Sequence, residues 1–267
     1  MKTFIFLLVS SVILAATFFH TNGYSINKII AAVFDYGKQP AVQAETITDA
    51  PEPLTDIIAE EPYEYAYAGF DPSPANINIP KWHLLLVNRD FILPEDYEIT
   101  LAPSITSDPD SLKLDYRVAE HYNEMYLAAL EDGIELKPVS GYRSPEKQRA
   151  NFHKKIDSYM AEGYSEAEAT QMASTVVLLP GTSEHNAGLA MDIISLEQDF
   201  DQTEEFAWLC ENAADYGFIM RYPEDKQHIT KIIYEPWHWR YVGVEAAQFM
   251  VATGQCFEEY LGVVEPD

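Results

Sequence analysis

Residues 189–194 read LAMDII, an apolar run that contains one carboxylate, Asp192. A short apolar run of this kind is typical of a buried β-strand. Side chains alternate along a strand, so Asp192 shares one face with Ala190 and Ile194. A buried carboxylate is costly unless it is paired with another group or bound to a metal ion. The fold of this chain must therefore supply a partner for Asp192.

His185 lies seven residues before Asp192 and is a candidate for that partner. Gly188, between them, would let the backbone fold back so that the two side chains converge. One interpretation of the pair is a metal site. The other is a turn that feeds a buried strand, with the histidine and the aspartate forming an ordinary hydrogen-bonded couple. Residues 183–192 (SEHNAGLAMD) do not decide between the two.

A second segment, residues 234–243 (YEPWHWRYVG), favours the metal site. It predicts a strand interrupted at Pro236, on which His238 and Arg240 point one way. Three aromatic side chains point the other way, toward the core or a cleft: Trp237, Trp239 and Tyr241. Glu235 lies three residues before His238, so it can approach the same centre without being a ligand.

Two histidine nitrogens and one aspartate oxygen, from His185, His238 and Asp192, form a ligand set that suits Zn²⁺. Three protein ligands leave a fourth position for water. Zinc lowers the pKa of that water to about 7, and a nearby carboxylate such as Glu235 can pass its proton to a leaving amine. The pattern therefore predicts a metallopeptidase. His228 is a rival third ligand, but strand alternation favours His238.

The pattern SxHxxGxAxD followed by ExWHxRYVG resembles the VanY-type D-alanyl-D-alanine carboxypeptidases and the related LD-carboxypeptidases of cell-wall peptide metabolism. The segment SGYRSPEKQ at residues 140–148 is also similar to that family. The resemblance covers roughly residues 82–261 and rests on two separated motifs in the same order. It implies a single compact α+β domain, with the metal on a central, mainly antiparallel sheet flanked by helices.

The resemblance also implies a role for individual residues. His185, Asp192 and His238 would be the zinc ligands. Glu235 would be the catalytic base. Arg143 would face the scissile carbonyl or the C-terminal carboxylate of the substrate, because its planar fork of donors suits an oxyanion or a carboxylate. The alternative for Arg143 is an arginine at a helix entry that braces a surface carboxylate.

Two further motif residues, Ser183 and Gln148, are candidate substrate contacts. Each could donate a hydrogen bond to the substrate peptide or to its carboxylate. The alternative for Ser183 is a turn cap. The alternative for Gln148 is a position on a solvated helix face.

The remaining sequence predicts helices and short strands in irregular order. Residues 115–133 predict a helix that ends at a glycine. Its buried stripe consists of Val118, Tyr122, Met125 and Ala129. Ser144 caps a second predicted helix, and Ser165 with Glu168 forms a capping box before a third that extends to near residue 180. Strands and helices do not alternate as regular βαβ units, so the sequence predicts an α+β fold.

Residues 1–23 contain an uncharged apolar run and predict a signal peptide or a short membrane anchor. Residues 24–78 predict an acidic, proline-containing linker, because proline and charge repulsion favour an extended chain. Residues 79–267 are the predicted zinc carboxypeptidase domain. We therefore expect an exported protein that works at the extracellular face of the cytoplasmic membrane or in the cell wall.

The chain carries 43 acidic and 17 basic residues, which gives a formal charge of −26. Such a surface repels nucleic acid and the anionic surface of a membrane, so neither is an expected partner. The expected partner is a peptidoglycan stem peptide or muropeptide. We expect the protein to be a monomer.

The chain has two cysteines, Cys210 and Cys256. They could form one disulfide or both be buried thiols. Helical spacing around Cys210 favours buried thiols, since free cysteine is often a core residue. No CxxC motif is present, so the sequence offers no thiolate metal site.

These observations together predict an exported, zinc-dependent D-alanyl-D-alanine carboxypeptidase that removes the C-terminal D-alanine from stem pentapeptides. One alternative is an LD-carboxypeptidase that acts on tetrapeptides and shares the same zinc site. Another is a non-catalytic muropeptide-binding module with a structural zinc ion. Glu235 argues against the module, because a purely structural site has no need of a base beside an open position.

Overall fold

The computed structural model describes residues 70–104 and 112–265. All of them belong to the second of two compact units, Glu61–Asp267. The predicted signal peptide or anchor, residues 1–23, lies outside the described residues, as does the predicted linker up to residue 69. No helix in the described part of the chain combines the length and apolar character needed to cross a bilayer.

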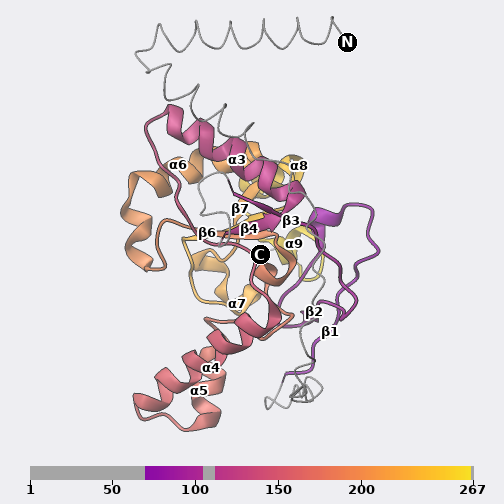
Figure 1. Ribbon diagram of the computed structural model, residues 1–267, viewed down its shortest axis with the longest axis vertical. Coiled ribbons are helices and arrows are strands. Elements are labelled where there is room, and N and C mark those ends of the chain that lie inside the picture. Colours follow the sequence, from indigo (N-terminus) through magenta and orange to yellow (C-terminus); the bar gives the residue numbers. More distant parts are fainter. Residues whose placement is uncertain (1–69, 105–111, 266–267) are drawn as a thin grey trace, which may run out of the picture. The chain divides into compact units, whose positions relative to one another are not determined.

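A four-stranded sheet lies in the middle of the domain (Figure 1). Its strand order is β5-β6-β8-β7, and all three neighbouring pairs are antiparallel. The strands are β5 (Pro138–Ser140), β6 (Ala190–Ile193), β7 (Phe218–Met220) and β8 (His238–Tyr241). The prediction of an α+β domain with a central, mainly antiparallel sheet is therefore confirmed.

The two motif strands, β6 and β8, pair directly. Asp192 on β6 lies opposite His238 on β8. Opposite residues of an antiparallel pair project from the same face, so the carboxylate and the imidazole lie together. The adjacent pair, Met191 and Trp239, projects from the other face into the core. The predicted strand alternation is confirmed for residues 190–193 and 238–241. The placement of Ile194 beside Asp192 is wrong, because Ile194 lies beyond β6 with a φ of 65° and packs against the core.

Helix α3 (Tyr116–Glu131) packs against the apolar face of this sheet. It begins after Asp115, whose side chain accepts a hydrogen bond from the backbone N–H of Arg117 at 3.0 Å. It ends before Gly133, which adopts a φ of 84°. The four residues of its predicted stripe are fully buried: Val118, Tyr122, Met125 and Ala129.

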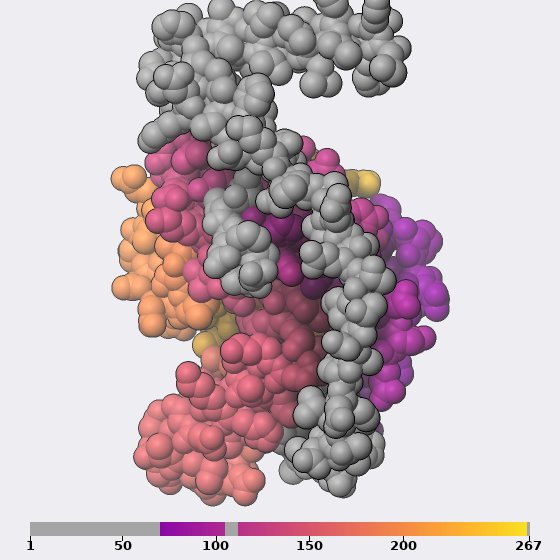
Figure 2. Space-filling view, in the orientation of Figure 1, coloured from indigo at the N-terminus to yellow at the C-terminus, as the bar shows by residue number. Residues whose placement is uncertain are grey.

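Helices α4 (Pro145–Ala161) and α5 (Glu166–Ala173) form a hairpin to one side of the sheet, seen in pink in Figures 1 and 2. Ser144 caps α4 by accepting a hydrogen bond from the backbone N–H of Lys147 at 3.2 Å. The predicted capping box of Ser165 and Glu168 is present at the start of α5. Both helix starts therefore follow from local sequence.

The prediction that the third helix extends to near residue 180 is wrong, because α5 ends at Ala173. The hydroxyl of Ser174 donates to the carbonyl of Gln171, and that of Thr175 donates to the carbonyl of Met172. Such side-chain bonds compete with helical hydrogen bonds. The β-branched residues at 176 and 177 also disfavour a further turn.

The C-terminal half of the domain covers the edges of the sheet with short helices. Helix α6 (Glu204–Asn212) continues as a 3₁₀ turn, η4 (Ala213–Tyr216), and ends at Gly217. The other helices are α7 (Gln227–Thr230), α8 (Val244–Thr253) and α9 (Phe257–Tyr260). Helix α8 packs against β7, which is the edge strand on that side.

Two small sheets complete the described domain. Strand β1 (Ser73–Pro74) is parallel to β2 (Phe91–Ile92), and β3 (Leu101–Pro103) is antiparallel to β4 (Lys113–Asp115). Ala75 is buried in the main core, so residues that the sequence assigned to the linker also pack against the domain.

The two cysteines are free. Cys256 is buried, as expected. The expected burial of Cys210 is wrong, because this residue is exposed on α6. The preceding residues Trp208 and Leu209 take the buried positions of that helix instead.

Candidate metal centre

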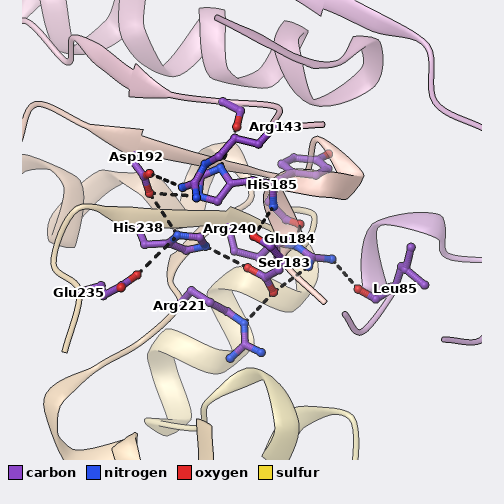
Figure 3. A network of polar contacts seen from close by, with 12 residues as sticks. Leu85, Arg143, Ser183, Glu184, His185, Asp192, Arg221, Glu235, His238 and Arg240 are labelled. Atoms are coloured by element: carbon purple, nitrogen blue, oxygen red, sulfur yellow. Dashed lines mark hydrogen bonds and ion pairs between the residues drawn. The ribbon is translucent and has the colours of Figure 1, made fainter. Parts of the chain in front are cut away.

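Three side chains from separate elements converge on the polar face of the sheet (Figure 3). His185 lies on the 3₁₀ turn η2 (Glu184–Ala187), Asp192 on β6 and His238 on β8. One potential ligand atom from each lies within 4.8 Å of the others. All three residues are at most 4% exposed. The structure therefore brings together the three residues that the sequence singled out as metal ligands.

The turn that carries His185 depends on Gly188. This glycine ends η2 with a φ of 64°, in the left-handed region that side chains disfavour. A Cβ atom added there would lie 2.7 Å from the backbone nitrogen of Asp115. Gly188 thus allows the sharp turn that the sequence suggested, and it also allows the close approach of β4.

Backbone and side-chain acceptors fix the orientation of both imidazoles. Nδ1 of His185 lies 2.8 Å from the carbonyl oxygen of Gly141, which can only accept, so Nδ1 carries the proton. Nε2 of His238 lies 3.1 Å from Oε2 of Glu184 and donates to that carboxylate. When both imidazoles are neutral, as metal binding requires, the lone pairs of His185 Nε2 and His238 Nδ1 therefore face Asp192.

Two polar atoms at the centre lack hydrogen-bond partners. Nε2 of His185 and Oδ1 of Asp192 are buried, have no hydrogen-bond partner and lie 3.3 Å apart. Nδ1 of His238 lies 3.1 Å from the same oxygen. Lone pairs that face one another in a buried site need a cation between them. Two imidazole nitrogens and one carboxylate oxygen fit a zinc ion.

The charges around the centre shift its titration strongly. Burial, followed by the charge of Arg143, lowers the pKa of His185 to about 4. Burial alone would lower the pKa of His238, but hydrogen bonds to Asp192 and Glu184 raise it to about 9. Burial would raise the pKa of Asp192, whereas the neighbouring histidines hold it well below its usual range. The centre is thus kept anionic at its carboxylate, as a cation site requires.

Glu235 lies beside this centre without joining it. Its Oε2 is 3.8 Å from Nδ1 of His238, and the residue is only 7% exposed. Burial raises the pKa of Glu235 to about 8. A carboxyl group with such a pKa can both take up and release a proton near neutral pH.

Arg143 joins the centre from the loop that precedes α4. Its Nη2 lies 3.0 Å from Oδ2 of Asp192, and its Nε donates to the hydroxyl of Ser140 at 3.0 Å. Its Nη1 donates to Oε1 of Gln148 at 3.1 Å. The alternative in which Arg143 braces a surface carboxylate does not hold, since Asp192 is buried.

Gln148 and Ser183 occupy less direct positions. Gln148 is buried rather than on a solvated face, and its Nε2 donates to the carbonyl of Leu178 at 2.6 Å. Its amide therefore links Arg143 to the chain that follows α5. The Ser183 hydroxyl caps η2 and accepts from the backbone N–H of His185 at 3.4 Å.

A buried charge network behind His238 was not predicted from the sequence. Oε1 of Glu184 accepts hydrogen bonds from Arg221 Nε and Arg240 Nη1, both at 2.8 Å. Arg221 also donates to both carboxylate oxygens of Glu258, at 2.8 and 2.6 Å. The two arginines hold the pKa of Glu184 far below its usual range against the effect of burial. Glu184 stands at an unspecified position inside the SxH motif, so only its neighbours in space reveal its part.

Tyr222 is a second residue that sequence reasoning missed. Its ring centroid lies 4.8 Å from that of His238, and its buried hydroxyl has no hydrogen-bond partner. No spacing or motif distinguishes this tyrosine among the 17 in the chain. By contrast, the rival ligand His228 is exposed on α7 and is absent from the converging group.

The centre opens into a cleft of about 740 Å³. The three metal-binding candidates line it together with all four other residues predicted for the site: Arg143, Gln148, Ser183 and Glu235. Tyr222 lines it as well. The cleft therefore gives a substrate access to the metal centre and to Glu235 at once.

Comparison with known proteins agrees with this geometry. The sequence model of the VanY family, described as D-alanyl-D-alanine carboxypeptidase, matches residues 111–244. A D-alanyl-D-alanine carboxypeptidase of Enterococcus faecalis (strain ATCC 700802 / V583) is 41% identical over 181 residues. That match covers 68% of this chain and 66% of the relative, slightly less than two thirds of its length.

Solved structures support the same relationship. A mutant of the vancomycin resistance D,D-pentapeptidase VanY in complex with Zn(II) superposes with a TM-score of 0.61 at 42% identity. The match covers 67% of this chain and 99% of that one. The LD-carboxypeptidase LdcB, at 35% identity and a TM-score of 0.60, is matched over 70% of this chain and 88% of its own. This chain therefore belongs to the VanY family of D-alanyl-D-alanine carboxypeptidases.

Proposed function

We propose that this protein removes the C-terminal D-alanine from the stem pentapeptides of peptidoglycan. It is a zinc-dependent D-alanyl-D-alanine carboxypeptidase. The observation that carries the proposal is the convergence of two imidazole nitrogens and one carboxylate oxygen beside a buried glutamate, at the base of an open cleft.

His185, Asp192 and His238 would hold the zinc ion, with His185 Nε2, a carboxylate oxygen of Asp192 and His238 Nδ1 as the available ligand atoms. When bound, zinc acts as a Lewis acid and lowers the pKa of water near it to about 7, which supplies a nucleophile at neutral pH. Gly141 and Glu184 orient the two imidazoles through their outer nitrogens, which keeps the ligand lone pairs directed at the ion.

Glu235 is the general base and general acid of the reaction. Its carboxylate accepts the proton of the attacking water, and the resulting carboxyl group delivers that proton to the nitrogen of the leaving D-alanine. The raised pKa of Glu235, about 8, suits a group that must change protonation in each half of the cycle. The buried setting of Glu235 also limits proton exchange with bulk water.

Arg143 stabilises negative charge on the substrate, either at the developing oxyanion or at the C-terminal carboxylate. Its guanidinium already lies against the metal centre, so a second anion can bind beside it. Gln148 orients the guanidinium through the hydrogen bond to Nη1. Ser183 lines the cleft, and its hydroxyl, which accepts from the backbone N–H of His185, keeps a proton to donate to the peptide or its carboxylate.

The setting of the enzyme is part of the same proposal. Its substrate is outside the cytoplasm, so we propose that residues 1–23 direct export or anchor the chain, and that the acidic linker lets the catalytic domain reach the wall. The protein acts as a monomer, because the described domain contains all the residues assigned to the reaction.

The test uses the full-length, zinc-loaded protein with muramyl pentapeptide and muramyl tetrapeptide, followed by mass spectrometry of the products. The expected result is loss of one alanine from the pentapeptide and at least a hundredfold lower rate for Glu235→Gln. Glu211→Gln, at an exposed position on α6, is the matched control and should retain the rate.

Other outcomes point elsewhere. Cleavage of the tetrapeptide alone would make the protein an LD-carboxypeptidase like LdcB, with the same zinc apparatus and a different pocket. Absence of Glu235-dependent cleavage of both peptides, by folded and zinc-loaded protein, would favour a muropeptide-binding module.

A further inference from the structure

One wall of the cleft is basic, although the chain as a whole is strongly acidic. Of the 17 lysines and arginines, five lie between residues 143 and 155, where only one acidic residue occurs. Three of these five line the cleft: Arg143, Lys154 and Lys155. Most of this stretch belongs to α4. A cleft wall that carries charge of one sign attracts ligand groups of the opposite sign. The distribution therefore points to an anionic group on whatever occupies the cleft.

The residues of α4 that line the cleft form one helical stripe. They follow Gln148 at spacings of three or four, and they are Asn151, Lys154, Lys155 and Ser158. This spacing places polar side chains along a single face of the helix. That face begins beside the metal centre, because Gln148 is hydrogen-bonded to Arg143. From Gln148 the face runs along α4 away from the metal centre.

The two lysines are available to a ligand. Lys154 is exposed and Lys155 is half-buried, with its Nζ 5.1 Å above the ring of Tyr159. Within the described part of the chain, neither ammonium group has a carboxylate partner, although other lysines such as Lys226 do. Glu197, on the β6–η3 connection, is the acidic residue that lines the cleft away from the metal centre.

Another part of the cleft lining is apolar. It includes Val177, from the segment that follows α5, and Ile232, from the segment before β8. A peptide in the cleft can place small apolar side chains against these residues while an anionic group meets the lysines of α4.

Helix geometry indicates how far upstream the lysines act. Lys155 lies seven residues beyond Gln148, which corresponds to about 10 Å along the helix axis. An extended peptide covers about 3.3 Å per residue, so this distance spans about three residues. If the C-terminal residue lies at Arg143, the lysines face the third residue before it.

We propose that Lys154 and Lys155 form a subsite for a carboxylate carried by the substrate about three residues before its C-terminus. This inference rests on the proposed function and specifies its substrate class. In a stem pentapeptide the residue at that distance is the γ-linked D-glutamate, whose α-carboxyl group is free in some walls and amidated in others. The enzyme accordingly prefers the free acid to the amide.

The test compares two synthetic pentapeptides that differ only in this group, one with D-isoglutamate and one with D-isoglutamine at the second residue. Full-length, zinc-loaded wild type should have a kcat/KM about threefold to tenfold higher for the acid, mainly through KM. In the double variant K154Q/K155Q this ratio should fall to near one. Raising the ionic strength should lower the wild-type ratio, because exposed charges are screened.

K147Q is the matched control, because Lys147 lies on the same helix, is exposed and does not line the cleft. Glutamine also keeps helix propensity close to that of lysine. A wild type that cleaves both peptides equally well, or a double variant that keeps the wild-type ratio, overturns the subsite. Failure to cleave either peptide would instead overturn the proposed function, so the two results are distinct.

Discussion

Glu184 Oε2 accepts a hydrogen bond from Nε2 of His238 at 3.1 Å, and this contact decides which imidazole nitrogen faces the metal centre. Arg221 and Arg240 hold the other carboxylate oxygen, so Glu184 cannot turn away. Glu184 and the two arginines are at most 1% exposed. The orientation of the proposed zinc ligand His238 is therefore set by Glu184, Arg221 and Arg240, none of which is among the candidate metal ligands.

Replacing Glu184 with glutamine should weaken zinc binding about 10- to 100-fold, because the outer partner of a metal-bound histidine supports its orientation and basicity. Competition with a chromogenic chelator measures the change in Kd. Circular dichroism at the same temperature shows whether the variant is folded, since the two buried arginines lose part of their charge partner. Glu211→Gln is the control. An unchanged zinc Kd in folded Glu184→Gln protein would contradict the assigned role.

Substitution of Gly188 by alanine should destabilise the protein more than the same change at Gly254. Both glycines have positive φ, 64° and 71°, so each alanine carries a backbone cost of about 1–2 kcal/mol. At Gly188 the new Cβ would also meet Asp115 N and Ile99 Cδ1, both at 2.7 Å, whereas nothing lies within 4 Å at Gly254. Overpacking adds about 1–3 kcal/mol. Urea unfolding of both variants measures the difference, and equal losses would show that the close approach of β4 is not tight.

Arg143 and Gln148 should act as a pair. Arg143→Lys removes the planar fork of donors, and we expect kcat/KM to fall about 100-fold. Gln148→Leu leaves Arg143 in place without its acceptor, so the loss should be smaller. Because the two side chains share a hydrogen bond at 3.1 Å, the double variant should lose less than the sum of the single losses. Steady-state kinetics on all four proteins test this, and strict additivity would mean that Gln148 does not position Arg143.

The stability of the metal-free protein should fall as the pH rises from about 6.5 to about 9. The pKa of His238 is raised to about 9 by its carboxylate partners, and that of Glu235 is raised to about 8 by burial. A group with a raised pKa binds more protons in the folded than in the unfolded state, so its contribution is lost as the pH passes through the folded value. His185, whose pKa is lowered to about 4, acts below this window, where its own contribution to stability rises with pH and opposes that of Glu235.

Zinc should reverse this trend, because metal binding requires deprotonated ligands and therefore strengthens with pH. The expected result is a difference in Tm between zinc-loaded and EDTA-treated protein that grows from pH 6.5 to pH 8.5. Differential scanning calorimetry at three pH values measures it. A metal-free Tm that rises across the same range would show that these two groups do not dominate the pH dependence.

Local sequence determined the elements that depend on neighbours in the chain. The stripe of α3, the caps at Ser144 and Ser165 and the alternation of β6 and β8 followed from spacing, since each depends on contacts within a few residues. The end of α5 was misjudged because the hydroxyls of Ser174 and Thr175 compete for helix carbonyls. The exposure of Cys210 was misjudged because helical spacing does not specify how far a buried stripe extends.

The motif residues of the site were also evident from the sequence. A carboxylate inside an apolar strand demands a partner, and strand alternation together with the resemblance to the VanY-type motifs pointed to His185 and His238. His185, Asp192 and His238 could therefore be named together before their positions were known. Gly188 could also be assigned to a turn, because glycine readily adopts the backbone conformation that a sharp reversal of the chain requires.

Tertiary structure alone decided what surrounds that site. Along the chain, 37 residues separate Glu184 from Arg221, and another 37 separate Arg221 from Glu258. No local pattern links residues so far apart. They meet because the packing of η2, β7 and α9 excludes water, and a buried charge then requires partners from any part of the chain. Packing likewise decided that Lys154 and Lys155 of α4 line the cleft. Spacing along the chain specifies which residues share a face, whereas only packing specifies what that face meets.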